Sequence, residues 1–178
     1  MKKHVLVISS SPRKEGNTDI LCDYFMRGAA EAGNEVEKVS LAGKKIGFCT
    51  GCYACEKGEC PQKDDVREIL EKMLKADVIV LATPVYFYTM CAQLKALIDR
   101  SVMFYPNIRN KTFFYIMCMA DTEKQNFRGT VEALHGFFLC CENSTEAGMV
   151  QASGMFEKGA IAGSPYCDEA YRLGKSIC

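Results

Sequence analysis

Several features are missing from this chain of 178 residues, and their absence excludes whole classes of protein. No apolar run approaches the roughly 18 residues that a membrane-spanning helix needs, so no membrane partner is expected. The 22 basic residues balance the 22 acidic ones, which leaves no electrostatic case for nucleic acid or an anionic membrane. Internal repeats, low-complexity segments and a convincing linker are also missing, so residues 1–178 are expected to form one domain.

The amino terminus has too little apolar sequence for a secretion signal. Its apolar run, Val5 to Ile8, is far shorter than the roughly 7–15 residues usual in a signal peptide, and Arg13 and Lys14 soon follow. The segment instead predicts a first strand. The cysteine count agrees with a cytoplasmic location, because eleven cysteines cannot all pair within one chain and a reducing compartment is favoured.

Seven cysteines lie outside one dense cluster. Free cysteine behaves as a small hydrophobic residue, so those in apolar stretches are expected to be buried thiols. These are Cys22, Cys91, Cys118, Cys140 and Cys141. Cys167 and Cys178 lie in the tail of the chain and are candidates for exposure.

Short apolar segments alternate with helical patterns along the chain. Strands are expected at residues 4–9, 35–41, 77–84 and 111–120, with a short fifth strand within 147–155, and helices near 18–33, 66–74, 92–102, 129–141 and 168–177. This alternation predicts an α/β fold with a parallel sheet and helices on both faces. Five strands suit the doubly wound order 2-1-3-4-5, in which ligands bind beyond the carboxyl ends of the strands.

The loop after the first expected strand reads SSSPRKEGNT at residues 9–18 and carries hydroxyl, amide and guanidinium groups. It lacks the G-x-G-x-x-G of a dinucleotide site and the G-x-x-x-x-G-K-S/T of a P-loop. A helix follows at once, so its free N–H groups and positive dipole end point into the loop. This combination suits one monoester phosphate, with an ordinary capped turn as the alternative.

Three consecutive aromatic residues, Tyr86, Phe87 and Tyr88, follow the third expected strand. Exposed rings at the carboxyl end of a central strand are awkward unless a flat ligand covers them. A phosphate anchor in the first loop and a planar platform in the third describe a mononucleotide with a large ring, and flavin mononucleotide (FMN) fits. Aromatic rings packed into the core are the alternative.

The cysteine cluster at residues 49–60 has the spacing C-x2-C-x2-C-x4-C at Cys49, Cys52, Cys55 and Cys60. Zinc sites usually pair two C-x2-C knuckles across a longer gap, so zinc fits poorly. Three thiolates at successive x2 spacing resemble the ligands of a cubane iron–sulfur cluster, with the fourth arriving after a short turn. A loop of redox-labile thiols without a cluster stays open as the alternative.

These motifs together resemble a known family. The patterns S-x-S-P-R-x-x-G-N-T after the first strand and T-P-V-Y-F-Y-x-M-x-A-Q-L-K-A-L-I-D-R after the third are similar to the flavodoxin-fold NAD(P)H-dependent FMN reductases, especially the iron–sulfur flavoproteins. The similarity runs from residue 4 to about 104, and beyond that it rests on strand order and the A-x-x-L-G-K ending at 170–175. A flavodoxin-like fold is therefore expected.

The resemblance implies a set of residues around the flavin. The phosphate would be held by residues of the first loop, namely Ser9, Ser11, Arg13, Asn17 and Thr18. The isoalloxazine ring would be lined by Thr83, Pro84, Val85, Tyr86, Phe87 and Tyr88. Ala120 and Asp121 are placed at the flavin edge, although the chain has ADTEKQN at 120–126 where relatives often carry glycines. No catalytic residue is expected, and His4 and His135 are expected to be structural, because the cofactor carries the chemistry.

The resemblance also implies a reaction. NAD(P)H would donate hydride to FMN, and the reduced flavin would pass electrons to an acceptor. The iron–sulfur flavoproteins have a compact cysteine motif in the same place, so the four clustered cysteines are implied as ligands of a 4Fe-4S cluster. Many simpler relatives keep a similar loop, with residues matching Asp64 and Asp65, without a demonstrated cluster.

Other functions remain open at this point. A flavodoxin-like electron carrier without nicotinamide turnover competes with the reductase, as does a cluster-free FMN reductase. A signalling receiver domain would need an acidic pair after the first strand, where this chain has serines and an arginine. A homodimer or homotetramer is expected.

Overall fold

The structure is a computed structural model that describes residues 2–178. Its main strands are parallel and lie in the order β2-β1-β3-β5-β6. They are β1 (His4–Ser9), β2 (Glu35–Ser40), β3 (Val78–Tyr86), β5 (Thr112–Cys118) and β6 (Thr145–Ala152). This is the expected doubly wound order, and the flavodoxin-like α/β fold is confirmed. A short strand absent from the expectation, β4 (Thr89–Met90), pairs antiparallel with the end of β3.

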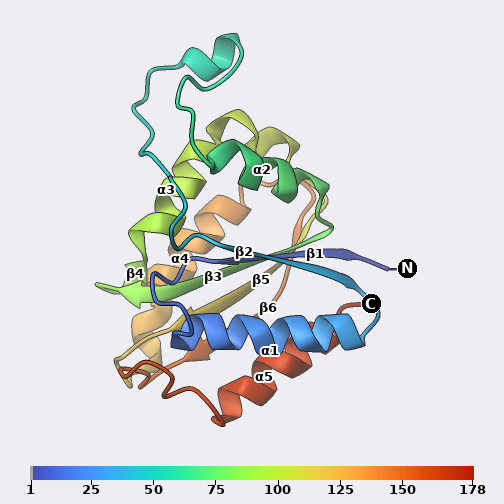
Figure 1. Cartoon of the computed structure of the whole chain (residues 1–178), viewed down its shortest axis with the longest axis vertical. Coiled ribbons are helices and arrows are strands. Elements are labelled where there is room, and N and C mark those ends of the chain that lie inside the picture. The colour runs from blue at the N-terminus through green and yellow to red at the C-terminus, as the bar shows by residue number, and fades with distance from the viewer. Residues whose placement is uncertain (1) are drawn as a thin grey trace.

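Helices cover both faces of the sheet (Figure 1). They are α1 (Asn17–Glu31), α2 (Val66–Lys75), α3 (Ala92–Arg100), α4 (Arg128–Phe138) and α5 (Pro165–Lys175). Among residues 2–178, no helix combines the length and the apolar character needed to cross a membrane.

Alternate residues of the central strand β1 point to opposite faces of the sheet, and each face has its own apolar core. Leu6 and Ile8 join the core beneath α2, α3 and α4. Val5 and Val7 join the core beneath α1 and α5. All four side chains are fully buried, so β1 is fixed in the middle of the sheet and its carboxyl end is held rigidly.

Helices α1 and α5 approach closely enough for their backbones to touch. A Cβ atom at Gly28 of α1 would overlap the carbonyl oxygen of Tyr171, and one at Gly174 of α5 would overlap the carbonyl oxygen of Phe25. Glycine lacks a Cβ and permits this contact. The contact gives the glycine of the A-x-x-L-G-K ending a structural role.

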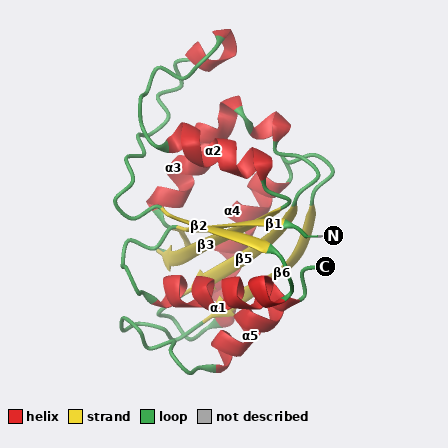
Figure 2. Ribbon diagram, turned by 45° about the vertical axis from the view of Figure 1, so that its right-hand side comes forward, coloured by secondary structure: helices red, strands yellow, loops and turns green. Residues whose placement is uncertain are grey.

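The segment between β2 and α2 carries the clustered cysteines and projects beyond α2 and α3 (Figures 1 and 2). It contains a short 3₁₀ turn at Ala54–Lys57. Leu41 and Ile46 at its start contact the core beneath α2, α3 and α4, whereas none of residues 47–65 is buried. The conformation of this projecting part therefore depends on polar contacts at its base.

The expectations for the isolated cysteines are mostly confirmed, with two corrections. Cys22, Cys91, Cys118 and Cys141 are buried, and Cys178 is exposed. Cys140 is exposed rather than buried, because α4 already ends at Phe138. Cys167 is buried rather than exposed, because α5 starts early enough to include it, and its thiol donates to the carbonyl of Ile161 at 3.2 Å.

Candidate functional site

A pocket of about 220 Å³ lies beyond the carboxyl ends of β1, β3 and β5. Residues of two loops that are far apart in the sequence line it together. Ser11, Arg13, Asn17 and Thr18 come from the loop and helix start after β1, and Pro84, Val85 and Tyr86 from the end of β3. The pocket thus lies where ligands bind in doubly wound sheets.

Helix α1 begins without a side-chain cap, which leaves backbone donors at the pocket. Its N-cap residue is Gly16, and among residues 2–178 no acceptor is paired with the N–H groups of Asn17 or Thr18. Free N–H groups and the dipole at a helix start favour an anion. A Cβ at Gly16 would lie 2.9 Å from the carbonyl oxygen of Arg13, so the tight turn requires glycine there.

Ser9 supports the loop between β1 and α1 from behind. It is fully buried, and its hydroxyl donates to Asp19 Oδ1 at 3.0 Å. Lys38 Nζ lies 2.6 Å from the same oxygen. Burial alone would raise the pKa of Asp19, but the contacts with Lys38, Glu15 and Ser9 lower it below its usual value. The negative charge of Asp19 is therefore neutralised within the protein, which reduces repulsion of an anion at the start of α1.

The loop after β6 reaches the pocket because Asn17 holds it. Asn17 Nδ2 donates to the carbonyls of Met155 at 3.1 Å and Glu157 at 2.9 Å, and Asn17 Oδ1 accepts from the N–H of Ile161 at 3.2 Å. These bonds place Met155 and Phe156 on the pocket wall. The side-chain amide of Asn17 is committed to this loop, so its backbone N–H is the group left for a ligand.

Four lining residues were missing from the sequence-based set: Gly16, Cys118, Met155 and Phe156. Ala120, which was expected at the flavin edge with Asp121, also lines the pocket. Met155 and Phe156 lie beyond the end of β6 at Ala152, in a loop where no site residue was expected. The Ser-Gly pair at 153–154 is a turn signal that marks this end. Cys118 and Ala120 follow from the rule that residues at the carboxyl ends of central strands line the site.

Thr83 and Asp121 hold loops rather than line the pocket. Thr83 is fully buried, and its hydroxyl oxygen accepts from the N–H of Cys91 at 3.0 Å. The carboxylate of Asp121 accepts from the N–H of Glu123 at 2.9 Å and from Asn126 Nδ2 at 2.7 Å. These hydrogen bonds lower the pKa of Asp121. A direct flavin contact of either residue stays a prediction.

The aromatic residues form the tip of a tight hairpin. Tyr86 pairs with Thr89 across β3 and β4, so Phe87 and Tyr88 are the central residues of the turn. Both have positive φ, 48° and 62°. Left-handed backbone costs an L-residue about 1–2 kcal/mol, and turns of this type prefer Asn-Gly. Tyr86 lines the pocket, while Phe87 is fully exposed beyond its wall.

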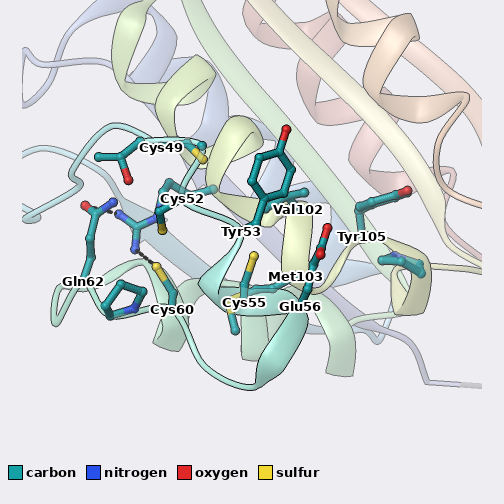
Figure 3. A pocket seen from close by; sticks show the side chains of 15 residues that line it. Cys49, Cys52, Tyr53, Cys55, Glu56, Cys60, Gln62, Val102, Met103 and Tyr105 are labelled. Carbon is teal, nitrogen blue, oxygen red and sulfur yellow. Dashed lines mark hydrogen bonds between the residues drawn. The ribbon is translucent and has the colours of Figure 1, made fainter.

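A second pocket, of about 420 Å³, is lined by all four clustered cysteines. Figure 3 shows Cys49, Cys52, Cys55 and Cys60 around it, close to Tyr53 and Met103. Within residues 2–178, no group of three cysteine, histidine or acidic side chains is arranged to hold a metal ion. The loop therefore brings the four thiols to one pocket without gathering their sulfur atoms around a common centre.

The exposed thiol of Cys52 lies where neighbouring donors stabilise its thiolate form. The N–H of Ala54 and the hydroxyl of Thr50 interact with it and lower its pKa. A lowered pKa increases the thiolate fraction, and the thiolate is the form that binds metals and reacts with oxidants.

The base of the cysteine loop is held by acidic residues that the family motif already contains. Asp64 Oδ2 accepts from the N–H of Gly47 at 2.9 Å, and Asp65 Oδ2 accepts from the N–H of Lys45 at 2.6 Å. Arg100 pairs with Asp64 at 2.7 Å from the end of α3. Sequence reasoning passed over Arg100, although it closes the aromatic-rich motif after the third strand.

The chain matches the model of the NADPH-dependent FMN reductase family over residues 3–138. It belongs to this family. An iron–sulfur flavoprotein of Methanocaldococcus jannaschii is 44% identical over 138 residues, which cover 76% of this chain and 71% of that protein. One from Archaeoglobus fulgidus is 45% identical over 94 residues, which cover 52% of this chain and 43% of that protein. Several of these curated relatives are matched over only about half of their length.

Solved structures agree with the fold of this FMN reductase family member. The NAD(P)H:quinone oxidoreductase from Methanothermobacter marburgensis has a TM-score of 0.77 at 18% identity, covering 98% of this chain and 96% of that one. An FMN-dependent NADH-azoreductase from Bacillus anthracis, in complex with FMN, has a TM-score of 0.70 at 14% identity, covering 98% and 96%. At these identities the likeness shows the fold alone. The family itself makes the chain an FMN-dependent oxidoreductase.

The strained hairpin gives a prediction about stability and flavin binding. Replacing Phe87 and Tyr88 by Asn and Gly is expected to raise the free energy of unfolding of the flavin-free protein by about 1–2 kcal/mol, because this pair suits the turn. The same double variant is expected to retain less FMN, because two rings beside the pocket are lost. Thermal unfolding and flavin stoichiometry measure the two effects.

Asn143 supplies the control for this experiment. It also has a positive φ, 54°, but does not line the pocket. Asn143→Gly is expected to leave FMN binding unchanged. A loss of stability in the hairpin variant would mean that the two rings stabilise the fold by packing, contrary to the prediction.

Proposed function

We propose that FMN binds in the pocket beyond β1, β3 and β5, with its phosphate at the start of α1. The observation that carries this proposal is the convergence of an uncapped helix start, a guanidinium and an apolar wall in one pocket. Arg13 and the N–H groups of Asn17 and Thr18 would hold the phosphate, and Pro84 and Tyr86 would contact the ring. This donor set fits a monoester phosphate joined to a planar ring.

We propose NAD(P)H as the reductant. Bound FMN would supply the hydride-accepting chemistry, and the chain's own residues position the ligands and exclude water. The exposed rings of Phe87 and Phe156 beside the pocket offer apolar surface to a second planar group. Steady oxidation of NADH or NADPH with an artificial acceptor tests this step. A protein that holds FMN without such turnover would be a flavodoxin-like carrier.

We further propose that Cys49, Cys52, Cys55 and Cys60 bind a 4Fe-4S cluster that passes single electrons from the flavin to an acceptor. Four thiols in one pocket match the ligand number and type of such a cluster. Binding would require the loop to draw the four sulfur atoms together. A cluster-free FMN reductase is the second candidate, because the thiols are not gathered as metal ligands within residues 2–178.

Cys55→Ser separates these two candidates. If the four thiols act as one ligand set, this variant is expected to lose iron and sulfide but keep FMN, because the flavin pocket lies on other loops. NAD(P)H should still reduce the flavin, while transfer to a one-electron acceptor slows sharply. Iron, sulfide and the visible spectrum are measured on protein purified without oxygen.

Cys178→Ser is the matched control, because Cys178 is exposed but lies in the tail. It is expected to keep iron, sulfide and FMN. An iron-free wild-type protein, prepared anaerobically with adequate iron, would contradict the cluster and leave the FMN reductase in place.

We also propose that the chain forms a homodimer or homotetramer in the cytoplasm. Large apolar side chains near the cysteine pocket are exposed, including Phe48, Tyr53 and Val102. Such surface is often covered by another subunit. The odd number of cysteines supports a reducing compartment. Analytical ultracentrifugation at several concentrations measures the assembly.

A further inference from the structure

Arg100 is a buried cation at the end of α3, beneath the cysteine loop. Its side chain is only 4% exposed, and its guanidinium group makes five hydrogen bonds with the loop and its base. Nη1 donates to the carbonyl of Gly47 at 2.9 Å and to Gln62 Oε1 at 2.8 Å. A bidentate pair with Asp64 neutralises the charge, with distances of 2.7 and 3.2 Å.

One of these hydrogen bonds is to the thiol of Cys60, one of the four cysteines proposed as cluster ligands. Arg100 Nη2 donates to Cys60 Sγ at 3.4 Å, and Figure 3 shows Cys60 and Gln62 turned toward the same guanidinium group. The group therefore contacts the loop both before Cys49, at Gly47, and at its last cysteine. Arg100 thus contacts both arms of the loop, which Asp64 and Asp65 also join through their bonds to Gly47 and Lys45.

The other end of α3 is fixed at the flavin pocket. Cys91 precedes the helix, and its N–H donates to the buried hydroxyl of Thr83 at 3.0 Å. Its thiol donates to Ser10 Oγ at 3.1 Å, within the loop that also carries the proposed phosphate site. A single short helix thus links the two pockets, with a fixed contact at each end.

We propose that Arg100 is the positioning residue for the cysteine ligands, holding the loop arms at a set separation and donating an N–H···S hydrogen bond to Cys60. This rests on the proposed cluster. Hydrogen bonds to sulfur ligands tune the reduction potential of a cluster, and partners of ligands typically change metal affinity by roughly 10- to 100-fold. Lysine cannot replace this group, because one ammonium cannot reach all of its acceptors.

The test uses Arg100→Met and the double variant Arg100→Met with Asp64→Leu. The single change leaves Asp64 without its cation, whereas the double change removes both charges, and such replacements are often tolerated by the fold. Lys95→Gln is the control on the same helix, because Lys95 is exposed and, within the described residues 2–178, forms an ion pair only with Asp99, at 2.6 Å. All variants are expected to keep FMN.

Two measurements on these proteins decide the proposal. In iron-free protein, amide hydrogen exchange of residues 49–62 is expected to speed up at least about tenfold in both Arg100 variants, but not in Lys95→Gln. In anaerobically reconstituted protein, loss of iron to a chelator is expected to accelerate roughly 10- to 100-fold. The midpoint potential of the cluster should also shift, while that of the flavin stays constant.

The possible results separate a failure of the role proposed for Arg100 from a failure of the cluster proposal. Wild-type exchange in the folded double variant would overturn the role of Arg100, whatever the iron content. If faster exchange came with wild-type iron retention and potential, Arg100 would hold the loop without acting on the ligands, and the proposal would also fail. If the wild type never binds iron, the cluster is wrong, and the role of Arg100 toward cluster ligands falls with it.

Discussion

Gly174→Val is expected to be the most damaging single substitution away from either pocket. Its side chain would need the space that the carbonyl of Phe25 occupies, so α5 must move away from α1. Overpacking of this kind typically costs about 1–3 kcal/mol and occasionally more, and the contact here is with rigid backbone. We expect a loss of at least about 3 kcal/mol in the free energy of unfolding, measured by denaturant titration.

A matched pair of alanine substitutions isolates the cause. Gly174→Ala adds one methyl group in the α1–α5 contact, whereas Gly136→Ala adds the same group on an exposed part of α4, where no atom of residues 2–178 outside the adjacent helix backbone lies within 4 Å. Helix propensity favours alanine over glycine by about 1 kcal/mol. Gly136→Ala should therefore be neutral or stabilising, and Gly174→Ala clearly destabilising. Equal effects at the two positions would contradict the close helix contact.

The strand order could be predicted from the sequence because periodicity and burial are local signals. Segment 4–9 is apolar from Val5 to Ile8, four positions that the sheet buries, although Ser9 at its end is buried as well, and the helix that follows begins within two residues of the expected start. Strand β4 was not predicted, because a strand of two residues is too short to show a periodic pattern. Its pairing with β3 also depends on the positive φ angles of Phe87 and Tyr88.

The site was predictable in part, for a similar reason. Arg13, Thr18 and Tyr86 lie next to strand ends, and the doubly wound order brings those ends together. The roles of Asn17 and Arg100 were not predictable, because each depends on partners more than thirty residues away in the chain. Rules based on composition or spacing use the residue type, but they give no information about which distant residue it will contact in the fold.

The phosphate anchor gives the largest expected effect on function. Arg13→Ala combined with Thr18→Val removes a guanidinium and a hydroxyl from the pocket at the start of α1. Hydrogen bonds to charged groups contribute about 1.5–3 kcal/mol each, so FMN is expected to bind at least about 100-fold more weakly. Isothermal titration of the flavin-free protein measures the dissociation constant directly.

The fold should tolerate this double change. Arg13 is exposed, and valine has nearly the shape of the buried Thr18, so the unfolding free energy of the flavin-free protein should change by no more than about 1 kcal/mol. Saturating FMN should raise the melting temperature of the wild type but barely that of the variant, because ligand stabilisation follows the ratio of concentration to dissociation constant.

Arg27→Ala is the control for lost positive charge on α1. Arg27 lies over the rings of Tyr24 and Tyr171, away from the pocket, so its removal should leave FMN affinity unchanged. Weak FMN binding by the double variant, together with wild-type FMN affinity in Arg27→Ala, would locate the phosphate at the start of α1. If the double variant binds FMN as tightly as the wild type, neither the guanidinium of Arg13 nor the hydroxyl of Thr18 holds the phosphate, and the proposed anchor is wrong.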